Sequence, residues 1–194
     1  MQSTIPYTKW HATKLATERL LKVCSSVTFA KEKPKTDPTA LFNLSYGLFV
    51  LTAKDGDKDS GCIVNTAFQV ANEPTKIAIS CQKGNLTREI IAKTGEFNLS
   101  VLTKEVPFEV IRHFGMQSGR DLDKFESCDC DTRAVNGIKY IPKYTNAYFS
   151  VKVEHSADLG SHELFVGEVT ESKTLSKEPS CTYAYYHSDI KPKK

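Results

Sequence analysis

The sequence predicts a mainly β protein, a closed antiparallel barrel with a few helices inserted between its strands. Three observations predict this class. Short segments with alternating apolar side chains recur between residues 41 and 187, turn-forming residues separate them, and helical patterns occur only as isolated inserts. A repeated βαβ arrangement would place a helix after nearly every strand, so the pattern favours the barrel.

The first strands are expected as a hairpin between Tyr46 and Gln69. Residues 46–53 are rich in β-forming side chains, and the polar turn after them contains Asp55-Gly56, which supplies the positive φ of a tight hairpin. The second strand is expected from Ser60 to Gln69. Further strands are expected at 76–80, 97–101, 149–153, 164–169 and 182–187.

Several strands, including 164–169, are apolar on both faces, as expected when a sheet curls into a barrel and also meets a partner chain. Two helices interrupt the strands. One is expected to follow the N-cap Asn85 and to end at Gly95. The other is expected to start with Pro107 as its first residue and to end at Gly115, with Phe108, Ile111 and Phe114 facing inward.

Residues 1–36 differ from the rest of the chain, with seven Lys or Arg residues against two acids. Apolar side chains between Lys9 and Val23 recur with helical spacing. We interpret this segment as a basic N-terminal arm or helix that packs on the main body. An organelle presequence is the alternative, although only one of the seven cations is arginine. We expect residues 37–190 to form the main domain and 191–194 a short basic tail.

The charge balance limits the class of partner. Among 194 residues, 26 are Lys or Arg and 23 are Asp or Glu, a formal net charge of +3, which is too even for a dedicated nucleic-acid binder. Hydrophobic residues make up 40% of the chain, enough to fill a core. The longest apolar-rich run, residues 41–53, is too short to span a bilayer. We therefore expect a folded cytoplasmic protein that binds neither nucleic acid nor membrane.

The cysteine and histidine patterns give no metal site. The six cysteines are dilute and include no C-x-x-C pair, so reduced thiols in a cytosolic protein are the favoured interpretation. A redox-active pair of Cys128 and Cys130 is the alternative. No two of the five histidines have metal-ligand spacing on one helix, and no metal is expected.

The clearest chemical signal lies at residues 80–87, where a strand ends and a helix begins at Asn85. The N–H groups and positive dipole end of a helix N-terminus suit a phosphate. Lys83 adds a cation, Gly84 allows close approach of the backbone, and Thr87 adds a hydroxyl donor. The alternative is a strand-to-helix cap in which Asn85 and Thr87 serve the backbone alone.

A second signal lies at residues 65–69, which place small polar side chains where a core strand would carry Val or Ile. Such groups can direct N–H and hydroxyl donors at a planar polar ring. The alternative is a strand that leaves the edge of the barrel.

Taken in order, these segments resemble the flavin reductase-like family over residues 41–187. The resemblance rests on the strand 46–52, the segment 65–70, Pro74 before a strand that ends in Lys83-Gly84-Asn85-x-Thr87, the strand 97–102, Phe114-Gly115-x-x-Ser118-Gly119-Arg120-Asp121-x-Asp123-Lys124-Phe125, and Gly160-Ser161-His162-Glu163-Leu164-Phe165-Val166-Gly167-Glu168-Val169. Residues 182–187 resemble the ending of members that precede a fused rubredoxin module.

The resemblance implies an FMN-binding split barrel, a Greek-key antiparallel barrel that works as a homodimer with FMN near the subunit interface. It also implies the site residues. Asn65, Thr66, Ala67 and Phe68 would flank the isoalloxazine and ribityl groups, Ser80, Cys81 and Gln82 would line the ribityl chain, and Lys83, Asn85 and Thr87 would hold the phosphate. His162 would face the flavin and the nicotinamide, or serve as a structural strand histidine. Many members carry Asp where Ser161 stands here.

The implied function is an NAD(P)H:flavin oxidoreductase that transfers a hydride from NADH or NADPH to FMN, and on to free flavin, oxygen or another acceptor, including an acceptor protein. In such an enzyme the protein chiefly orients two rings, which agrees with the missing catalytic triads. A non-catalytic FMN protein that carries electrons between protein partners is the alternative. A barrel that has lost flavin is a third reading, against which the phosphate-site residues argue.

Overall fold

The computed structural model describes residues 36–126 and 132–193. The chain divides into two units, Met1–Pro38 and Thr39–Lys194, and the second is described here. The expected helix between Lys9 and Val23 lies outside the described residues, as do Cys128 and Cys130. No helix in the described part is long and apolar enough to cross a membrane.

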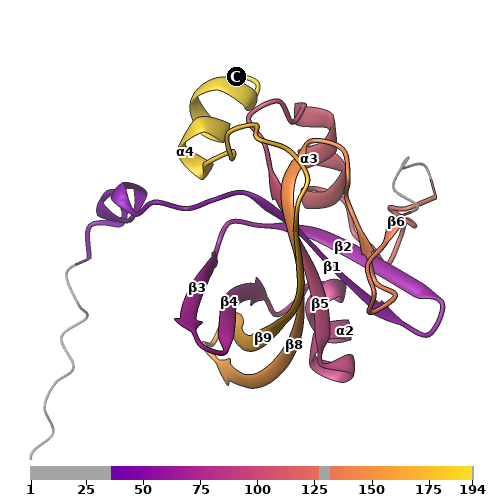
Figure 1. Cartoon of the computed structure of the whole chain (residues 1–194). Helices are drawn as coiled ribbons and strands as arrows, with labels where there is room; N and C mark the ends of the chain where they lie inside the picture. The colour runs from indigo at the N-terminus through magenta and orange to yellow at the C-terminus, as the bar shows by residue number, and fades with distance from the viewer. Residues whose placement is uncertain (1–35, 127–131, 194) are drawn as a thin grey trace, which may run out of the picture. The chain divides into compact units, whose positions relative to one another are not determined.

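Seven antiparallel strands form one sheet in the order β2-β1-β5-β8-β9-β4-β3 (Figure 1). A short second sheet pairs β6 with β7. The strands are β1 Phe49–Asp55, β2 Lys58–Val64, β3 Ala67–Asn72, β4 Thr75–Gln82, β5 Glu96–Leu102, β6 Thr132–Arg133, β7 Lys139–Tyr140, β8 Thr145–Asp158 and β9 His162–Thr174. The helical elements are η1 Pro38–Asn43, α2 Leu86–Thr94, α3 Phe108–Gly115, α4 Tyr183–Tyr185 and η2 Tyr186–Ile190.

The sheet curls into a barrel that stays open along one seam. Its two edge strands, β2 and β3, follow each other in the chain and are joined by Asn65 and Thr66 alone. Opposite edges of a seven-stranded sheet meet through two residues only if the sheet closes on itself. The single strand expected from Ser60 to Gln69 is therefore wrong, because this segment belongs to two strands. The chain leaves one edge at Val64 and joins the other, where the Ser80 N–H donates to the Thr66 carbonyl at 3.1 Å.

The barrel interior holds the main hydrophobic core, and α2 packs against it. Leu51, Ile79, Phe97 and Phe165 are at most 2% exposed and lie in one cluster with Ile90 and Ile91 of the helix. The expected caps of α2 are confirmed. The Asn85 side chain accepts a hydrogen bond from the Thr87 N–H, and Gly95 closes the helix with φ 74°. The Asp55–Lys58 hairpin, with Gly56 at φ 57°, is confirmed too.

A second core lies on the outer face of β1. Phe49 and Leu51 point into the barrel, whereas Leu48 and Val50 belong to a cluster with Ile111 of α3. The strand is thus apolar on both faces because α3 and the C-terminal segment of the same chain cover its second face. The helix α3 ends at Gly115 as expected, but Pro107 is its N-cap rather than its first residue.

The strand expected at residues 182–187 is wrong. Strand-like pairing ends at the isolated bridge between Gly47 and Thr182. The Thr182 hydroxyl then accepts a hydrogen bond from the Tyr185 N–H, which starts the short helix α4 and the π-helical turn η2. Tyr183 packs on Tyr186 and His187 within this segment, so side chains that favour strands form a helical aromatic cluster here, in which Tyr186 is buried.

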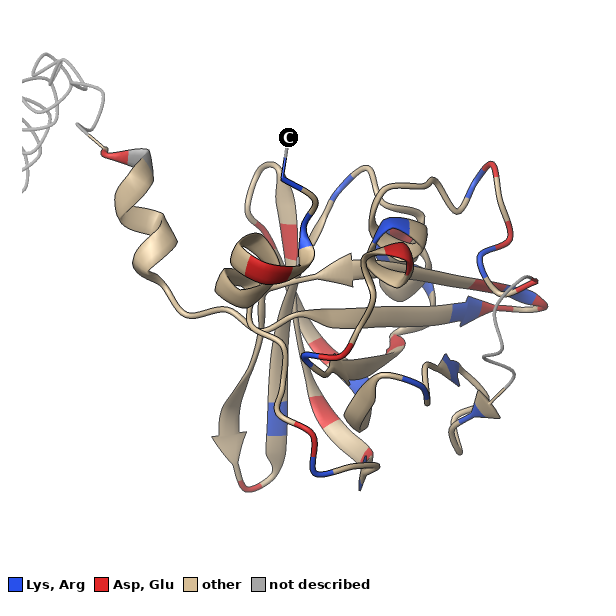
Figure 2. Ribbon diagram, turned by 90° about the horizontal axis from the view of Figure 1, so that it is seen from above, with Lys and Arg blue, Asp and Glu red and all other residues tan. Residues whose placement is uncertain are grey.

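Acidic and basic residues are interspersed over the strands and helices of the described part (Figure 2). Several ion pairs connect the hairpin of β1 and β2 to neighbouring elements. Arg133 makes two hydrogen bonds to Asp59, at 2.7 and 2.9 Å, and Lys93 at the end of α2 pairs with Asp55. These ion pairs hold exposed elements in place and contribute little to stability individually.

Candidate functional site

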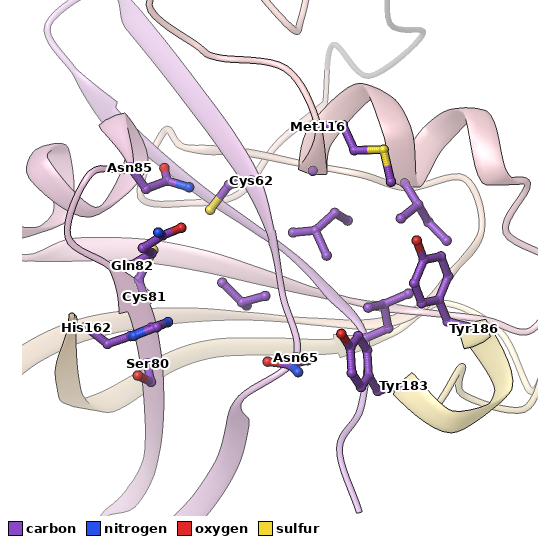
Figure 3. Close-up of a pocket in the computed structure, with 15 residues that line it drawn as sticks. Cys62, Asn65, Ser80, Cys81, Gln82, Asn85, Met116, His162, Tyr183 and Tyr186 are labelled. Atoms are coloured by element: carbon purple, nitrogen blue, oxygen red, sulfur yellow. The ribbon is translucent and has the colours of Figure 1, made fainter. Parts of the chain in front are cut away.

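A cavity of about 320 Å³ opens where β2, β4 and the start of β9 meet the end of α3 and the C-terminal helix (Figure 3). Apolar groups form one part of its lining, and the polar side chains of Asn65, Ser80, Gln82, Asn85 and His162 form another. The remaining lining residues are Leu48, Cys62, Ile63, Val64, Cys81, Ile111, Gly115, Met116, Tyr183 and Tyr186.

The polar side of the cavity is fixed by the pairing of β4 with β9. Gln82 and His162 are register partners, and the Lys83 N–H donates to the Ser161 carbonyl at 3.1 Å. The His162 ring is exposed, with its Nδ1 2.9 Å from the Ser161 hydroxyl. The sheet therefore holds the His162 backbone at the cavity rim, while its ring stays accessible to a ligand.

Tyr183, Tyr186 and Met116 lie on the other side of the cavity from Gln82 and His162 (Figure 3). The two tyrosines stack at 6.0 Å between ring centroids. Sequence reasoning missed this wall because it assigned residues 182–187 to a strand. The helical stacking of the aromatic side chains is a tertiary effect that strand periodicity does not reveal.

A second, more polar pocket of about 240 Å³ adjoins the first and shares Gln82 and Asn85 with it. It lies at the N-terminus of α2 and is also lined by Ser60, Gly61, Gly84, Leu86, Gln117, Ser118, Gly119 and Lys124. A Cβ added to Gly84 would meet no heavy atom within 4 Å, so this glycine borders open space. A helix N-terminus beside such space suits an anion.

Lys124 is the buried cation of this second pocket. It is 4% exposed, and its amine donates to the carbonyls of Gly61 at 2.9 Å and Phe114 at 2.8 Å. Burial lowers the pKa of Lys124 below its ordinary value. Lys124 belongs to the motif at residues 114–125, but the sequence assigned it no role. Its position between Asp123 and the apolar Phe125 was the only sign in the sequence that this lysine could be buried.

Asn85 and Thr87 serve the structure as well as the pocket. Asn85 Oδ1 caps α2 at 2.9 Å from the Thr87 nitrogen, and the fully buried Thr87 hydroxyl lies 2.9 Å from the Ser60 hydroxyl. Asn85 lines both pockets, whereas Thr87 lines neither. The Thr87 hydroxyl thus supports Ser60 at the wall of the polar pocket.

Lys83 lies apart from both pocket linings. Its amine pairs with Asp158 Oδ2 at 2.5 Å, and its carbonyl accepts hydrogen bonds from the Arg88 guanidinium. The hydrogen bond from Lys83 holds the pKa of the Asp158 carboxyl below its usual range, as does the Gly160 N–H.

Thr66, Ala67 and Phe68 do not line the main cavity. The Thr66 hydroxyl donates to Asn65 Oδ1 at 3.1 Å. Ala67 and Phe68 border a separate, mostly apolar pocket of about 190 Å³, with Phe49, Leu99 and Phe149. The structure therefore brings together Asn65, Ser80, Cys81, Gln82, Asn85 and His162 of the expected site residues.

Residues 41–194 match the family model described as "Flavin reductase like domain". The chain belongs to the flavin reductase-like family. It is accordingly an oxidoreductase of the flavin reductase type, and the family resemblance inferred from its motifs is confirmed.

Two curated proteins are similar to most of the domain. A high molecular weight rubredoxin of Moorella thermoacetica is 41% identical over 78% of this chain, which covers 66% of that protein. A ferric-chelate reductase (NAD(P)H) of Archaeoglobus fulgidus is 34% identical over 78% of this chain and 89% of its own length.

Solved structures of flavin reductase-like proteins share the fold. The NADH:FAD oxidoreductase of Streptomyces globisporus has a TM-score of 0.67 and 20% identity, over 76% of this chain and 90% of its own. An FMN-binding protein from Thermus thermophilus has a TM-score of 0.64 and 17% identity, over 75% of this chain and 79% of its own. These likenesses confirm the expected mainly β barrel.

Proposed function

We propose that the chain binds FMN and uses it to move electrons from NADH or NADPH to free flavin, oxygen or another acceptor. One observation carries the proposal. A cavity with an aromatic and a polar wall adjoins a polar pocket that combines a helix N-terminus with a buried lysine. This shape suits a ligand with a flat heteroaromatic ring at one end and a phosphate at the other.

The residues present fit FMN in one orientation. The Tyr183 and Tyr186 wall and the polar groups of Asn65 and Gln82 would hold the ring in the main cavity. Ser80, Cys81 and Gln82 would line the ribityl chain. Asn85, Gly84 and Ser118 at the N-terminus of α2 would hold the phosphate, with Lys124 as the buried cation. Lys83 would add a cation at the rim if it released Asp158.

FMN, when bound, would supply a two-electron acceptor for the hydride of a nicotinamide. The protein's own residues would position the flavin ring against the nicotinamide ring and exclude unreactive arrangements of the two. Backbone pairing with Gln82 holds His162 at the rim, where the imidazole can hydrogen-bond to the nicotinamide carboxamide. The Ser161 hydroxyl, 2.9 Å from Nδ1, leaves Nε2 to face the ligand.

We also propose a cytoplasmic homodimer. The edge strand β3 exposes Phe68 by 55% and Val70 by 45%, next to the mostly apolar pocket bordered by Phe149. An exposed apolar edge beside an apolar hollow is typical of a surface that a partner covers. Sedimentation equilibrium at micromolar concentration should give a dimer, and a monomer that retains FMN would contradict this part of the proposal.

Two relatives support different classes of electron acceptor. The ferric-chelate reductase supports NAD(P)H as donor and a ferric chelate as acceptor, and the rubredoxin relative supports a small electron-transfer protein. The alternative function, an FMN protein that shuttles electrons between protein partners without using NAD(P)H, is favoured only by the rubredoxin relative.

An anaerobic stopped-flow experiment tests the function. Protein reconstituted with FMN is mixed with NADH or NADPH, and bleaching of the flavin absorbance is followed. Bleaching at least as fast as steady-state oxidation of the same donor supports the proposal. Absence of bleaching by both donors, with rapid bleaching by dithionite, would favour the electron-shuttle alternative. Riboflavin, which lacks the phosphate, should bind more weakly than FMN, and equal affinities would contradict the phosphate pocket.

A further inference from the structure

Two thiols from strands that are not hydrogen-bonded to each other meet in the wall of the main cavity. Cys62 is on β2 and Cys81 on β4, each is 2% exposed, and both line the cavity. Figure 3 shows the Cys62 sulfur directed toward Cys81 and Gln82. Both cysteines are free thiols, and both belong to the hydrophobic cluster inside the barrel.

The surroundings make the two thiols unequal. The hydrogen bond from Cys81 lowers the pKa of the Cys62 thiol, and hydrogen bonds from Thr87 and Asn85 and the charge of Lys124 act in the same direction against burial. The hydrogen bond to Cys62, together with burial, raises the pKa of Cys81. Cys62 is therefore the nucleophile of the pair and Cys81 the proton donor.

We propose that Cys62 and Cys81 form a reversible redox site that hydrogen peroxide converts from a dithiol to a disulfide in the cavity wall. The proposal stands on their shared cavity and on the direction of the Cys62 sulfur toward Cys81, and it goes beyond the proposed function without depending on it. A packing role alone would not require two cysteines in the wall of a ligand cavity.

The chemistry balances in two steps. The Cys62 thiolate attacks one peroxide oxygen, so that an S–O bond forms, the O–O bond breaks and hydroxide leaves. The Cys81 sulfur then attacks the Cys62 sulfur, the S–O bond breaks, and the oxygen leaves as water with the Cys81 proton. The two thiols lose two electrons and the peroxide gains two. A dithiol reductant reverses the change by exchange.

The disulfide would tie β2 to β4 beneath the position proposed for the ribityl chain. A ligand in the cavity shields both sulfurs, since their 2% exposure leaves the cavity as their route to solvent-borne peroxide. Bound FMN is therefore expected to slow the oxidation, and the pair would respond to peroxide mainly when the cavity is empty.

Peptide mapping of the full chain tests the proposal. FMN-free protein is treated with hydrogen peroxide, remaining thiols are blocked with N-ethylmaleimide, and the chain is cleaved with trypsin. Cleavage after Lys58, Lys76 and Lys83 places Cys62 in peptide 59–76 and Cys81 in peptide 77–83. We expect these peptides linked, lighter by two hydrogens than their sum, and released by dithiothreitol. Recovery of both cysteines as maleimide adducts, or as sulfinic acids without a link, would overturn the proposal.

Variants test the order of the steps. In Cys81→Ser, Cys62 should stop at the sulfenic acid and be trapped by dimedone, and in Cys62→Ser, Cys81 should stay reduced. Trapping of Cys81 instead would overturn the assignment of Cys62 as nucleophile. Cys181→Ser is the matched control, because Cys181 is also a buried free thiol but lies in the second core. It should leave the linked peptide unchanged. A disulfide that forms equally fast with FMN bound would confirm the redox site and count against the FMN placement.

Discussion

The amine of Lys83 and the carboxylate of Asp158 form an ion pair, 2.5 Å from Nζ to Oδ2, at the rim of the proposed phosphate site. Lys83 is on the turn before α2, and Asp158 is the last residue of β8. Lys83, the cation predicted to bind a phosphate, is therefore already paired with a carboxylate. A phosphate would have to compete with Asp158 for the Lys83 amine. Within the described residues, no carboxylate forms an ion pair with the buried Lys124.

Replacement of Asp158 should tighten FMN binding. Asp158→Asn removes the competing charge and frees Lys83 to reach the phosphate, whereas Lys83→Ala removes the cation. We expect opposite changes of a few-fold in the Kd of FMN, because exposed ion pairs are worth about 0.2–1 kcal/mol. Quenching of flavin fluorescence measures both. The affinity for riboflavin should not change, and an unaltered Kd of FMN in both variants would remove Lys83 from the site.

Loss of the Lys124 charge should weaken FMN binding more strongly. A charge-assisted hydrogen bond contributes about 1.5–3 kcal/mol, so Lys124→Gln is expected to raise the Kd of FMN by at least tenfold and leave that of riboflavin unchanged. Lys124→Met should in addition lower stability, because the Gly61 and Phe114 carbonyls lose their donor. Urea unfolding separates the two effects. Equal loss of FMN and riboflavin affinity would show that Lys124 acts through the fold alone.

A methyl group at position 84 should obstruct the phosphate pocket without disturbing the fold. The added Cβ of Gly84→Ala would meet no protein atom within 4 Å, so the change in unfolding free energy should stay within about 0.5 kcal/mol. The Kd of FMN should rise and that of riboflavin should not. Binding of FMN with wild-type affinity would contradict close approach of the phosphate to this backbone.

His162→Ala should slow flavin reduction more than it weakens FMN binding. Loss of one neutral hydrogen bond costs about 0.5–1.5 kcal/mol, up to about tenfold in rate if the contact is made in the transition state. His155→Ala, which alters an exposed histidine of β8, is the control. The measurement is the anaerobic reduction rate per bound FMN. A structural histidine would instead lower the melting temperature and leave that rate unchanged.

Tyr148→Phe should destabilise the protein in a pH-dependent manner. The Tyr148 hydroxyl donates to Glu171 Oε1 at 2.7 Å, and this bond is the main reason that the pKa of Glu171 is lowered. A carboxyl with a lowered folded-state pKa adds stability above its unfolded pKa, and that stability is lost as pH falls through the folded value. The difference in unfolding free energy, about 1.5–3 kcal/mol at pH 7, should therefore shrink below pH ~4.5. A constant difference across that range would contradict the coupling.

The sequence predicted correctly the helix caps and the turn that depend only on neighbouring residues. The Asn85 and Gly95 caps and the Asp55-Gly56 turn involve neighbouring residues, and all were confirmed. The departure of the chain from the barrel edge at residues 65–69 was left as one of two alternatives, because curling of the sheet, a long-range property, separates β2 from β3. The Tyr183 and Tyr186 wall was missed for a similar reason, since aromatic residues favour strands until tertiary packing stacks them in a helix.

The candidate site, like the fold, depends on contacts between residues that are far apart in the sequence. Asn65, Ser80, Gln82 and His162 come together because strand ends that are far apart in sequence share one rim, and the family resemblance supplied that relationship. The pairing of Lys83 with Asp158 depends on the bend of β8, which carries register shifts at Ser150/Val151 and Val153/His155. No spacing of residue types in the sequence encodes that bend.

The two-residue junction between β2 and β3 also sets the width of the seam. Three virtual bonds separate the Cα atoms of Val64 and Ala67, so the two barrel edges can stand no more than about 10–11 Å apart at that point. The junction thus limits how far the two edges can separate beside Asn65, independently of any side chain. Each residue inserted there would raise this limit by up to about 3.5 Å, so the length of one loop sets the greatest width that the seam can reach at this point.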